Sequence, residues 1–354
     1  MRRDADVVVV GGGIIGVAAL RALSRSGIDA VLLERFELGH TRGSSHGASR
    51  IFRLSYPEPA YTRLALAARE GWRELEAECG ERLIVHTGSL DLGDEAANAE
   101  RSLARLGIRF EALSGQAASR RWPLAFEPQA ELVFQPDGGY LLADRARVAL
   151  ATSARAAGGE LVERERIARV AIHVDGVTVG TDVREITARA VVVAAGAWAR
   201  GLLAPLGIEL PVVATRETVA YYSQPGVEEL PPLIEYPSSA SPLPPGQAYY
   251  ALPAPGSGLK AGVHHSGPPA DPDEDGVPDP AVVEATSAWV ARRYPEADAT
   301  PLATETCLYT STSDQTFVIE RHGRVVVASA CSGHGFKFAP VHGELIAGLA
   351  REVA

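Results

Sequence analysis

The feature that most constrains the fold of this chain is a strand, a glycine-rich turn and a helix at its N-terminus. Residues 7–10 are four consecutive valines, which is typical of a parallel strand buried on both faces. The GGGIIG stretch at 11–16 then opens a helix, and a second apolar run at 30–33 ends at Glu34. Strand, helix and strand in this order form a βαβ unit, so we expect an α/β fold with a parallel sheet.

This unit predicts a dinucleotide site. Gly11, Gly13 and Gly16 permit a tight turn and a close approach of the backbone to a pyrophosphate, which would rest on the helix N-terminus. Glu34 ends the second strand, where a carboxylate can accept hydrogen bonds from ribose hydroxyls. Because all four parts are present, we favour dinucleotide binding over a merely structural turn. The motif alone does not separate NAD from FAD.

The same N-terminal stretch could be mistaken for a secretory signal, because two arginines precede it. Two aspartates intervene, however, and three consecutive glycines would be poor in a membrane-spanning helix. No run reaches the ~18 apolar residues of a transmembrane helix, so no membrane segment is expected. Cys79, Cys307 and Cys331 are scattered without a C-x-x-C motif, which predicts neither a disulfide framework nor a zinc site and favours the cytoplasm.

The length and charge of the chain narrow its class further. With 354 residues it exceeds one ordinary core, so two domains or one interleaved unit are expected. The net charge is −10 and there is no cluster of Lys and Arg, which argues against nucleic acid as a partner.

Buried-strand patterns recur at 188–199 and 324–335, so the dinucleotide-type segments lie at both ends and in the middle of the chain. Between them, ETVAYY, AYYALPA and LKAGVHH are typical of strands in an antiparallel sheet. Proline-rich 236–246 and acidic 267–280 are expected to be long surface loops, and 280–294 an amphipathic helix. The two domains should therefore interleave.

Lysine is almost absent from this chain. Of the 34 lysine and arginine residues, only Lys260 and Lys337 are lysine, and both have apolar neighbours. Arginine is held permanently charged, whereas lysine is a compact ammonium whose pKa can move. Because buried lysines are rare without a task, we favour a functional role for both over the chance survival of two surface lysines.

Other candidate residues are ambiguous when taken alone. Arg50 and Arg53 stand three apart, which can mean one helical face, and two exposed arginines at a helix start are the favoured interpretation. In an extended strand, Lys260 and His264 would point to one face. An isolated cysteine such as Cys307 is usually a small core residue.

The motifs taken together carry more information than each alone. They are GGGIIG, GSSHGASRIFRLSY, GLKAGVH, CLYT and SGHGFKFAP, in this order. In this set the chain resembles the monomeric sarcosine oxidase family of flavoenzymes, which includes N-methyltryptophan oxidase and pipecolate oxidase. The resemblance covers nearly the whole chain. It implies FAD rather than NAD, and the oxidation of an amine that bears a carboxylate.

The resemblance also implies roles for residues. It implies that Cys307 is joined to the flavin through an 8α thioether, that Lys260 serves oxygen reduction, and that Arg53 and Lys337 hold the substrate carboxylate. The expected catalytic residues are Lys260, His264, Arg50 and Tyr309, and the expected substrate-binding residues are Arg53, Lys337 and Tyr250. The expected cofactor-binding residues are Gly11, Gly13, Ile14, Ile15, Gly16, Glu34, Arg35, Ser44, Ser45, His46, Arg50, Gly196, Trp198, Cys307, Gly333, His334, Gly335 and Lys337, and no metal site is expected.

We therefore expect an α/β protein in which a Rossmann-type FAD-binding domain interleaves with a mixed-sheet α+β substrate domain. The FAD-binding domain should comprise residues 1–85, 141–205 and 300–354, and the substrate domain 86–140 and 206–299. Compared with the family, the chain is shorter after Lys337, its 236–246 loop looks longer, and Cys331 replaces what is often a bulky apolar residue. These differences affect the substrate side chain more than the reaction type.

The expected reaction is the oxidation of a secondary, N-methyl amino acid by flavin. O2 would reoxidise the flavin and give H2O2, and the imine would hydrolyse to an aldehyde and an amine. A cyclic imino acid such as a pipecolate- or proline-like ring is the alternative substrate. A dehydrogenase that passes electrons to a partner protein, which Lys260 disfavours, and a non-catalytic flavin-binding module are the other classes. A monomer is favoured.

Overall fold

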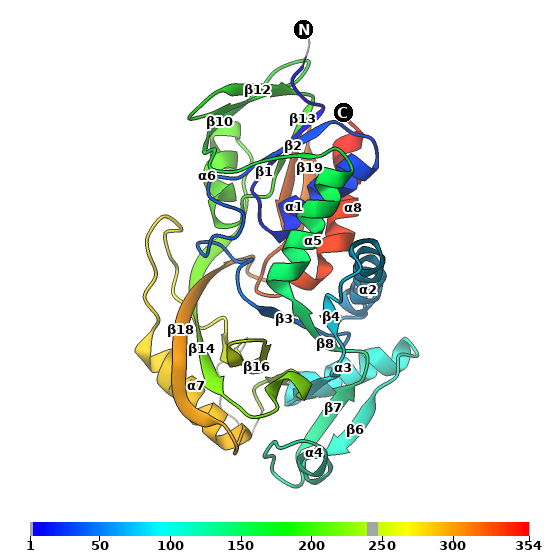
Figure 1. Ribbon diagram of the computed structural model, residues 1–354, viewed down its shortest axis with the longest axis vertical. Coiled ribbons are helices and arrows are strands. Elements are labelled where there is room, and N and C mark those ends of the chain that lie inside the picture. Colours follow the sequence, from blue (N-terminus) through cyan, green and yellow to red (C-terminus); the bar gives the residue numbers. More distant parts are fainter. Residues whose placement is uncertain (1–2, 239–246, 354) are drawn as a thin grey trace.

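The computed structural model describes residues 3–238 and 247–353, and its upper half in Figure 1 is built on a mostly parallel six-stranded sheet. The strand order is β19-β20-β13-β1-β2-β9, and only β19 and β20 pair antiparallel. The strands are β1 (Val7–Val10), β2 (Ala30–Leu33), β9 (Glu160–Val162), β13 (Ala190–Val193), β19 (Val318–His322) and β20 (Val325–Ser329). The predicted buried strands at the two ends and in the middle of the chain thus meet in one sheet.

Each face of this sheet packs against its own core, because successive side chains point to opposite faces. Val7 and Val9 pack with α1 (Ile14–Arg25), α5 (Ala143–Ala156) and α8 (Ala339–Arg351). Val8 and Val10 pack with the other core, which includes β11 (Val177–Thr181) and α6 (Ala199–Leu203). The helices of the first core lie on the right in Figure 1, and both chain ends lie near the top. Burial on both faces explains the unbroken valine runs.

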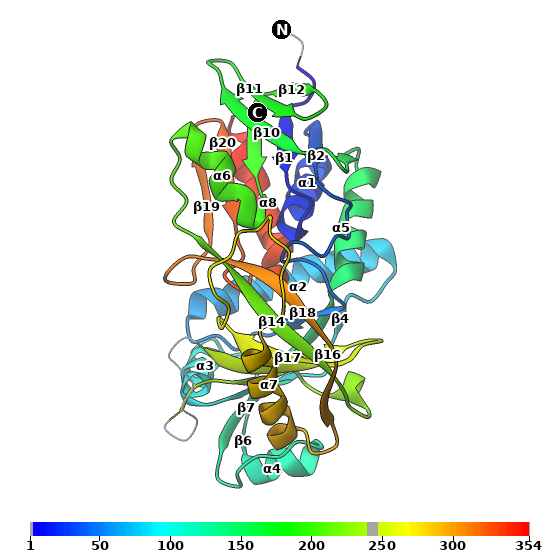
Figure 2. The ribbon, with the colours of Figure 1, turned by 90° about the vertical axis from the view of Figure 1, so that its left-hand side faces the viewer.

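The lower half of the molecule contains a mixed eight-stranded sheet of order β18-β14-β17-β16-β15-β5-β7-β6, in which only β15 and β5 pair parallel. Its strands are β5 (Ser89–Leu92), β6 (Glu111–Ser114), β7 (Glu131–Gln135), β14 (Val213–Ser223), β15 (Leu233–Glu235), β16 (Ala248–Ala254), β17 (Gly258–His264) and β18 (Asp298–Ser311). The three strands predicted from ETVAYY, AYYALPA and LKAGVHH are therefore confirmed. The predicted helix at 280–294 is confirmed as α7 (Pro280–Arg293), which packs on β14, β17 and β18 (Figure 2).

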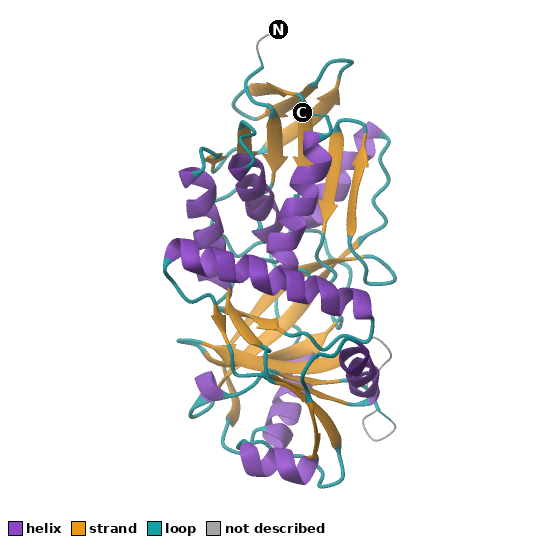
Figure 3. Ribbon diagram, turned by 90° about the vertical axis from the view of Figure 1, so that its right-hand side faces the viewer, coloured by secondary structure: helices purple, strands orange, loops and turns teal. Residues whose placement is uncertain are grey.

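Smaller elements join these two halves. The strand β8 (Gly139–Leu142) lies between β3 (Ser49–Phe52) and β4 (Ile84–Val85) in a three-stranded sheet. The long helix α2 (Pro59–Cys79) runs across the middle of the molecule (Figure 3). The remaining elements are β10 (Ile167–Ile172) and β12 (Glu185–Ala188), which form a sheet with β11 at the top, and α3 (Asp94–Arg105) and α4 (Gly115–Arg121) at the bottom.

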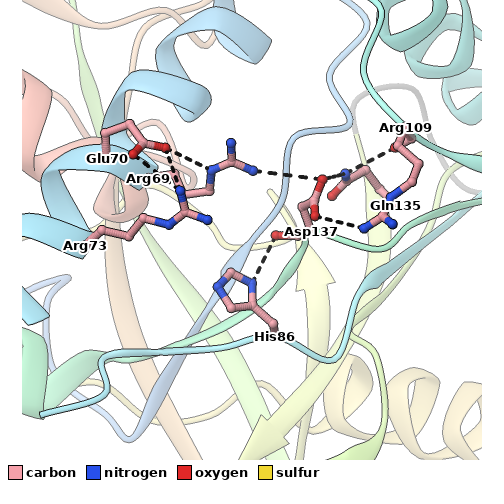
Figure 4. Close-up of polar contacts among 7 residues, drawn as sticks. All are labelled: Arg69, Glu70, Arg73, His86, Arg109, Gln135 and Asp137. Atoms are coloured by element: carbon pink, nitrogen blue, oxygen red, sulfur yellow. Dashed lines mark hydrogen bonds and ion pairs between the residues drawn. The ribbon is translucent and has the colours of Figure 1, made fainter.

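A surface polar network fixes α2 to the turn between β7 and β8 (Figure 4). Asp137 in this turn faces Arg69 of α2 at 3.9 Å and Arg109 at 3.2 Å. The backbone oxygen of Asp137 lies 3.2 Å from Nδ1 of His86, in the segment between β4 and β5. Because β4 and β8 belong to the small sheet and β5 and β7 to the large one, this network holds the two connections between the small sheet and the eight-stranded sheet, at 85–89 and 135–139.

The architecture confirms the predicted α/β class with a second, mixed sheet. The domain boundaries stay a proposal, which is supported by the crossings at 85–89 and 135–139, next to the boundaries predicted after residues 85 and 140. Residues 300–311, which were predicted to lie in the FAD-binding domain, instead form most of β18 in the eight-stranded sheet, because this segment pairs with β14 along nearly its whole length. The predicted 236–246 loop lies, from residue 239 onward, outside the described residues.

Candidate active site

A cavity of about 1260 Å³ runs from the six-stranded sheet to the face of the eight-stranded sheet. Its walls include the GGGIIG turn and the 43–53 segment on one side and β16, β17 and β18 on the other. Every predicted site residue lines this cavity except Gly16 and His46. The fold therefore brings together side chains that are spread over more than three hundred residues of sequence.

The glycines at the dinucleotide end are explained by close backbone packing. Gly11 has a φ of 105°, and a Cβ there would lie 2.6 Å from the backbone oxygen of Ala194. A Cβ on Gly16 would lie 1.9 Å from the oxygen of Gly11, so Gly16 does not line the cavity but lets α1 sit against the turn. Together they bring β1, α1 and β13 close enough for the helix N-terminus to face the cavity.

Some backbone N–H groups at the dinucleotide end of the cavity donate hydrogen bonds to side chains. Glu34 accepts from N–H of Gly12 at 2.6 Å and of Phe36 at 2.8 Å, and the hydroxyl of Ser45 accepts from N–H of Ile14 at 3.0 Å. Glu34 is buried, lines the cavity and holds the turn through these hydrogen bonds. That it also accepts hydrogen bonds from a ribose is a proposal.

An aromatic and charged cluster closes the outer part of this end. The carboxylate of Asp273, from the acidic 267–280 loop, accepts from Arg35 at 2.5 Å and from the indole N–H of Trp198 at 2.8 Å. The guanidinium of Arg35 lies 4.9 Å from the ring centre of Phe36. The predicted surface loop at 267–280 is therefore confirmed, and Asp273 ties it to two of the predicted cofactor-binding residues.

The centre of the cavity contains Cys307, Lys260 and Arg50. Lys260 is only 7% exposed and, within the described part of the chain, has no hydrogen-bond acceptor. Burial, followed by the neighbouring Arg50, lowers the pKa of Lys260 to about 8. Burial raises the pKa of the Cys307 thiol, while the Lys260 and Arg50 cations act in the opposite direction. The site thus gathers two cations around a thiol.

Arg50 and Arg53 do not lie on a helix start, contrary to the interpretation favoured from their spacing alone. Arg50 lies in strand β3 and Arg53 directly follows it. Arg50 donates to the backbone oxygens of Ser44 at 2.8 Å, His46 at 2.6 Å and Ser49 at 2.8 Å. The half-buried loop before β3 supplies acceptors that the sequence pattern does not reveal, so Arg50 turns inward.

His46 contacts Arg50 rather than the cavity. Its ring lies 3.1 Å from the backbone oxygen of Gly43, and its own backbone oxygen accepts from Arg50. Burial, then Arg50 and Lys260, lowers the pKa of His46 to about 4, so the imidazole is neutral at ordinary pH. The position of His46 supports a role in holding Arg50.

Aromatic side chains form the wall opposite Arg50. Nδ1 of His264 lies 3.3 Å from the hydroxyl of Tyr309, and burial, then the adjacent His265, lowers the pKa of His264 well below its ordinary value. Tyr250 and Tyr309 lie close enough for each to shift the pKa of the other, although burial is the main cause that raises both, and all three side chains line the cavity. A Cβ on Gly333 would lie 2.4 Å from both His264 and Tyr309, so only glycine fits against this wall.

The two cations at the far end of the cavity are Arg53 and Lys337. Nζ of Lys337 donates to the hydroxyl of Tyr56 at 2.8 Å and to the backbone oxygen of His334 at 2.8 Å. Burial, followed by Arg53, lowers the pKa of Lys337 well below its ordinary value. Lys337 is 5% exposed, which confirms that the second lysine of the chain is not a surface residue.

The sequence analysis missed the partner of Arg53, which is Asp91. Nη1 of Arg53 lies 2.7 Å from Oδ1 of Asp91 and also donates to the hydroxyl of Tyr236. Asp91 has no exposed surface, yet the pattern Ser-Leu-Asp-Leu in β5 is that of a strand with one solvent-facing side. Only the packing of β5 inside the sheet could reveal that Asp91 faces Arg53.

These residues fit a bound FAD. The glycine turn leaves the N–H groups of Gly13 and Ile15 without an acceptor among residues 3–238 and 247–353, which is the pattern that a pyrophosphate requires. The cavity also exceeds the roughly 300–1,000 Å³ of an ordinary small-molecule pocket, so it has room for a dinucleotide and a small substrate. Within the same described ranges, no group of His, Cys, Asp or Glu side chains is arranged to hold a metal ion, and no helix is long and apolar enough to cross a membrane.

Comparison with known proteins agrees with this site. The family model described as FAD dependent oxidoreductase matches residues 6–349. The chain is 34% identical to peroxisomal sarcosine oxidase from Homo sapiens, over 96% of this chain and 90% of the relative. It is 32% identical to monomeric sarcosine oxidase from Bacillus sp. (strain B-0618), over 98% of this chain and 92% of the relative.

Among solved structures, the fold is similar to the open form of NikD, which is described as an unusual amino acid oxidase essential for nikkomycin biosynthesis. The TM-score is 0.88 with 31% sequence identity, and the match covers 99% of this chain and 94% of that chain. Sequence and structure comparisons therefore both extend over both halves of the molecule.

Proposed function

The chain belongs to the family of FAD-dependent oxidoreductases, and on that premise we propose that it oxidises a small secondary amine that bears a carboxylate, as a sarcosine oxidase-like N-methyl amino acid oxidase. The observation that carries this proposal is the pair of cations at the end of the cavity, the buried Lys337 and Arg53, whose side chain is 12% exposed. Buried charges are costly unless they are paired, so this end should select an anion. The sarcosine oxidase relatives support an N-methyl amino acid as substrate.

The dinucleotide end would hold the adenosine and pyrophosphate of FAD. We assign this role to the helix N-terminus at Gly13 and Ile14, with Glu34, Arg35 and Trp198 around it. When bound, FAD supplies an acceptor for the hydride that leaves the carbon next to the substrate nitrogen. The protein must then hold that carbon against the acceptor, which is a matter of positioning.

Arg53 and Lys337 hold the substrate by its carboxylate. Arginine meets a carboxylate with directed N–H donors, and lysine adds a compact charge from another direction. The neutral His264 and the hydroxyls of Tyr309 and Tyr250 line the wall where the amine would lie. They can hydrogen bond with the amine without adding a charge that would compete with the carboxylate site.

Cys307 is the proposed point of covalent attachment of FAD. Its thiol lines the cavity on β18, and it lies close enough to Lys260 and Arg50 for both cations to favour the thiolate. A thiolate is the nucleophilic form of cysteine. Cys79 is exposed on α2 and does not line the cavity, whereas Cys331 does and is the alternative thiol.

Lys260 is assigned to the reaction with O2. A buried ammonium stabilises the negative charge that develops when O2 is reduced beside it. The overall reaction takes one N-methyl amino acid, one O2 and one water. It gives the primary amino acid, formaldehyde and H2O2, so that atoms and electrons balance. The enzyme is proposed to work as a monomer, which the name of the monomeric sarcosine oxidase relative supports. It is also proposed to work in the cytoplasm, where its three scattered cysteines would stay reduced.

The test is anaerobic reduction of the purified flavoprotein with a panel of N-methyl and cyclic amino acids, each compared with its parent primary amino acid. The proposal predicts bleaching of the flavin absorbance by secondary amino acids, and formaldehyde with H2O2 in equal amounts in air for N-methyl substrates. Bleaching by none of them would contradict the proposal.

A cyclic secondary amino acid is the second candidate substrate. The rings of Tyr56 and Tyr236 lie 4.5 Å and 5.7 Å from the guanidinium carbon of Arg53, so the carboxylate site is flanked by flat apolar surfaces. A pipecolate- or proline-like ring could pack there with its carboxylate on the same cations. The panel separates the two, because a cyclic substrate releases no formaldehyde.

A further inference from the structure

Within the described part of the chain, Asp91 is the one carboxylate that forms an ion pair with a cation of the proposed carboxylate site, and that cation is Arg53. It lies in β5, paired with Ile234 on one side and Val133 on the other, and none of its surface is exposed. Oδ1 accepts from Nη1 of Arg53 at 2.7 Å, and Oδ2 accepts from the hydroxyl of Ser55. Asp91 does not itself line the cavity, so it lies behind Arg53 as seen from the cavity.

Arg53 uses only one of its nitrogens on the protein. Nη1 serves Asp91 and Tyr236, whereas Nε and Nη2 have no partner in residues 3–238 and 247–353. The side chain of Arg53 is 12% exposed and lines the cavity, so part of its guanidinium faces the open space. The guanidinium therefore stands between a fixed carboxylate behind it and an open position in front.

The charges around this position can be counted. Arg53 and Lys337 each carry one positive charge when protonated, Asp91 carries one negative charge, and Tyr56 lies between the two cations. The sum over Arg53, Lys337 and Asp91 is one positive charge, so a single bound carboxylate makes these three groups neutral. Glu95, which lines the cavity and acts on Tyr236, adds a negative charge beyond them. A second carboxylate nearby would leave a net negative charge in a buried place, which is unfavourable.

Stabilisation of the fold alone does not explain this arrangement. A buried ion pair contributes little net stability compared with apolar side chains of the same volume, because desolvation opposes the attraction. An aspartate used only for folding would also have no need of a partner that lines the cavity. Burial raises the pKa of Asp91 and Arg53 opposes that shift, so the pair depends on Arg53 staying in place.

We propose that Asp91 is a specificity-determining residue that sets the charge of the carboxylate site through Arg53, so that the site accepts secondary amino acids with one carboxylate and rejects those with a second carboxylate close by. This inference rests on the proposed function. Asp91 acts through Arg53 and does not touch the substrate, so its effect should appear in the charge of the preferred ligand.

The experiment measures the dissociation constants of acetate and malonate for the FAD-loaded protein, from the change in flavin absorbance. The wild type should bind malonate at least about 10-fold more weakly than acetate, because the second charge is unmatched. Asp91→Asn keeps the size and a hydrogen-bond acceptor but removes the charge. It should improve malonate relative to acetate by at least about 10-fold.

Two further variants separate charge from structure. Ser55→Ala removes the other hydrogen bond to Asp91 and keeps its charge, so its ratio of malonate to acetate binding should stay at the wild-type value. In an Arg53→Met background, adding Asp91→Asn should leave the ratio unchanged, because the route through Arg53 is gone. An Asp91 with only a structural role would change both dissociation constants together and leave the ratio alone.

The outcomes distinguish the two proposals. If the wild type binds malonate as tightly as acetate, the inference is overturned without any variant, even if Asp91→Asn does not fold. If the ratio is unchanged in a folded Asp91→Asn, the inference is also overturned, while the carboxylate site stands. If the wild type binds neither acetate nor any N-methyl amino acid, the proposed function itself fails.

Discussion

Replacing Lys260 with methionine tests whether this residue serves the reaction with O2 and not the oxidation of the substrate. A pKa of about 8 instead of the ordinary 10.5 means that the site disfavours the Lys260 ammonium by about 3 kcal/mol. A negative charge that forms on O2 beside the ammonium can offset this cost. A direct Coulomb estimate for charges about 4 Å apart at an effective dielectric of 20 gives about 4 kcal/mol. Lys260→Met should therefore slow flavin reoxidation by roughly 10²- to 10³-fold.

The assay is stopped-flow mixing of the reduced protein with O2, beside anaerobic reduction by substrate. Because the pKa of Lys260 is lowered, the ammonium predominates below pH 8 and is lost above it. The wild-type reoxidation rate should therefore fall as the pH rises through about 8, and this step should be missing in Lys260→Met. Lys260→Arg is the matched control, since it keeps the charge at every pH tested.

The reasoning is refuted if Lys260→Met reoxidises at the wild-type rate, or if both half-reactions slow by the same factor. In the second case Lys260 would shape the cavity as a whole. Arg50 stays in the variant and keeps one positive charge nearby, so a residual reaction with O2 is expected and does not count against the assignment.

Three further predictions follow from the same cavity. Denatured wild type should keep its flavin and Cys307→Ser should lose it; release of flavin from fully loaded wild type would contradict covalent attachment. The pKa of Lys337 is lowered, and a bound carboxylate favours its ammonium form, so acetate binding should take up a proton and weaken as the pH rises. Calorimetry in buffers of different ionisation enthalpy measures this proton uptake. Lys337→Met should abolish the uptake and weaken acetate binding by about 10²-fold. In a Cys307→Ser background, Asp273→Asn should speed FAD release by roughly 5- to 10-fold, measured by flavin fluorescence, because it weakens the bonds to Arg35 and Trp198. Asp275→Asn is the control, since Asp275 in the same loop pairs with Arg42 instead. Equal rates of release for the two variants would show that the bonds of Asp273 do not retain FAD.

The parts of the fold that the sequence predicted well are those whose pattern is local. The valine run at 7–10, the GGGIIG turn and the strand before Glu34 each follow from residues next to one another in the chain. Lys260 and Lys337 could also be singled out, because a chain so poor in lysine makes each one conspicuous. Burial of both lysines then followed from the chemistry of an ammonium that can change its pKa.

The parts that failed depend on contacts between distant segments. The spacing of Arg50 and Arg53 taken alone favoured a helix start, because it does not show that Arg50 donates to backbone oxygens of the preceding loop. Only the family resemblance implied a site role for both. Asp91 and Asp273 gave no signal, since an acidic residue in a strand or a loop is usually solvated. Their partners are 38 and 238 positions away in sequence, and only the tertiary structure brings them together.

The most direct test of the account is anaerobic reduction of the flavin by a matched pair of substrates, an N-methyl amino acid and its methyl ester. The ester lacks the negative charge that can meet Arg53 and Lys337 in the acid. The account predicts that the acid bleaches the flavin and that the ester needs at least about 10²-fold higher concentration for the same rate. Equal reduction by acid and ester would contradict the carboxylate site, and with it the substrate class proposed for this enzyme.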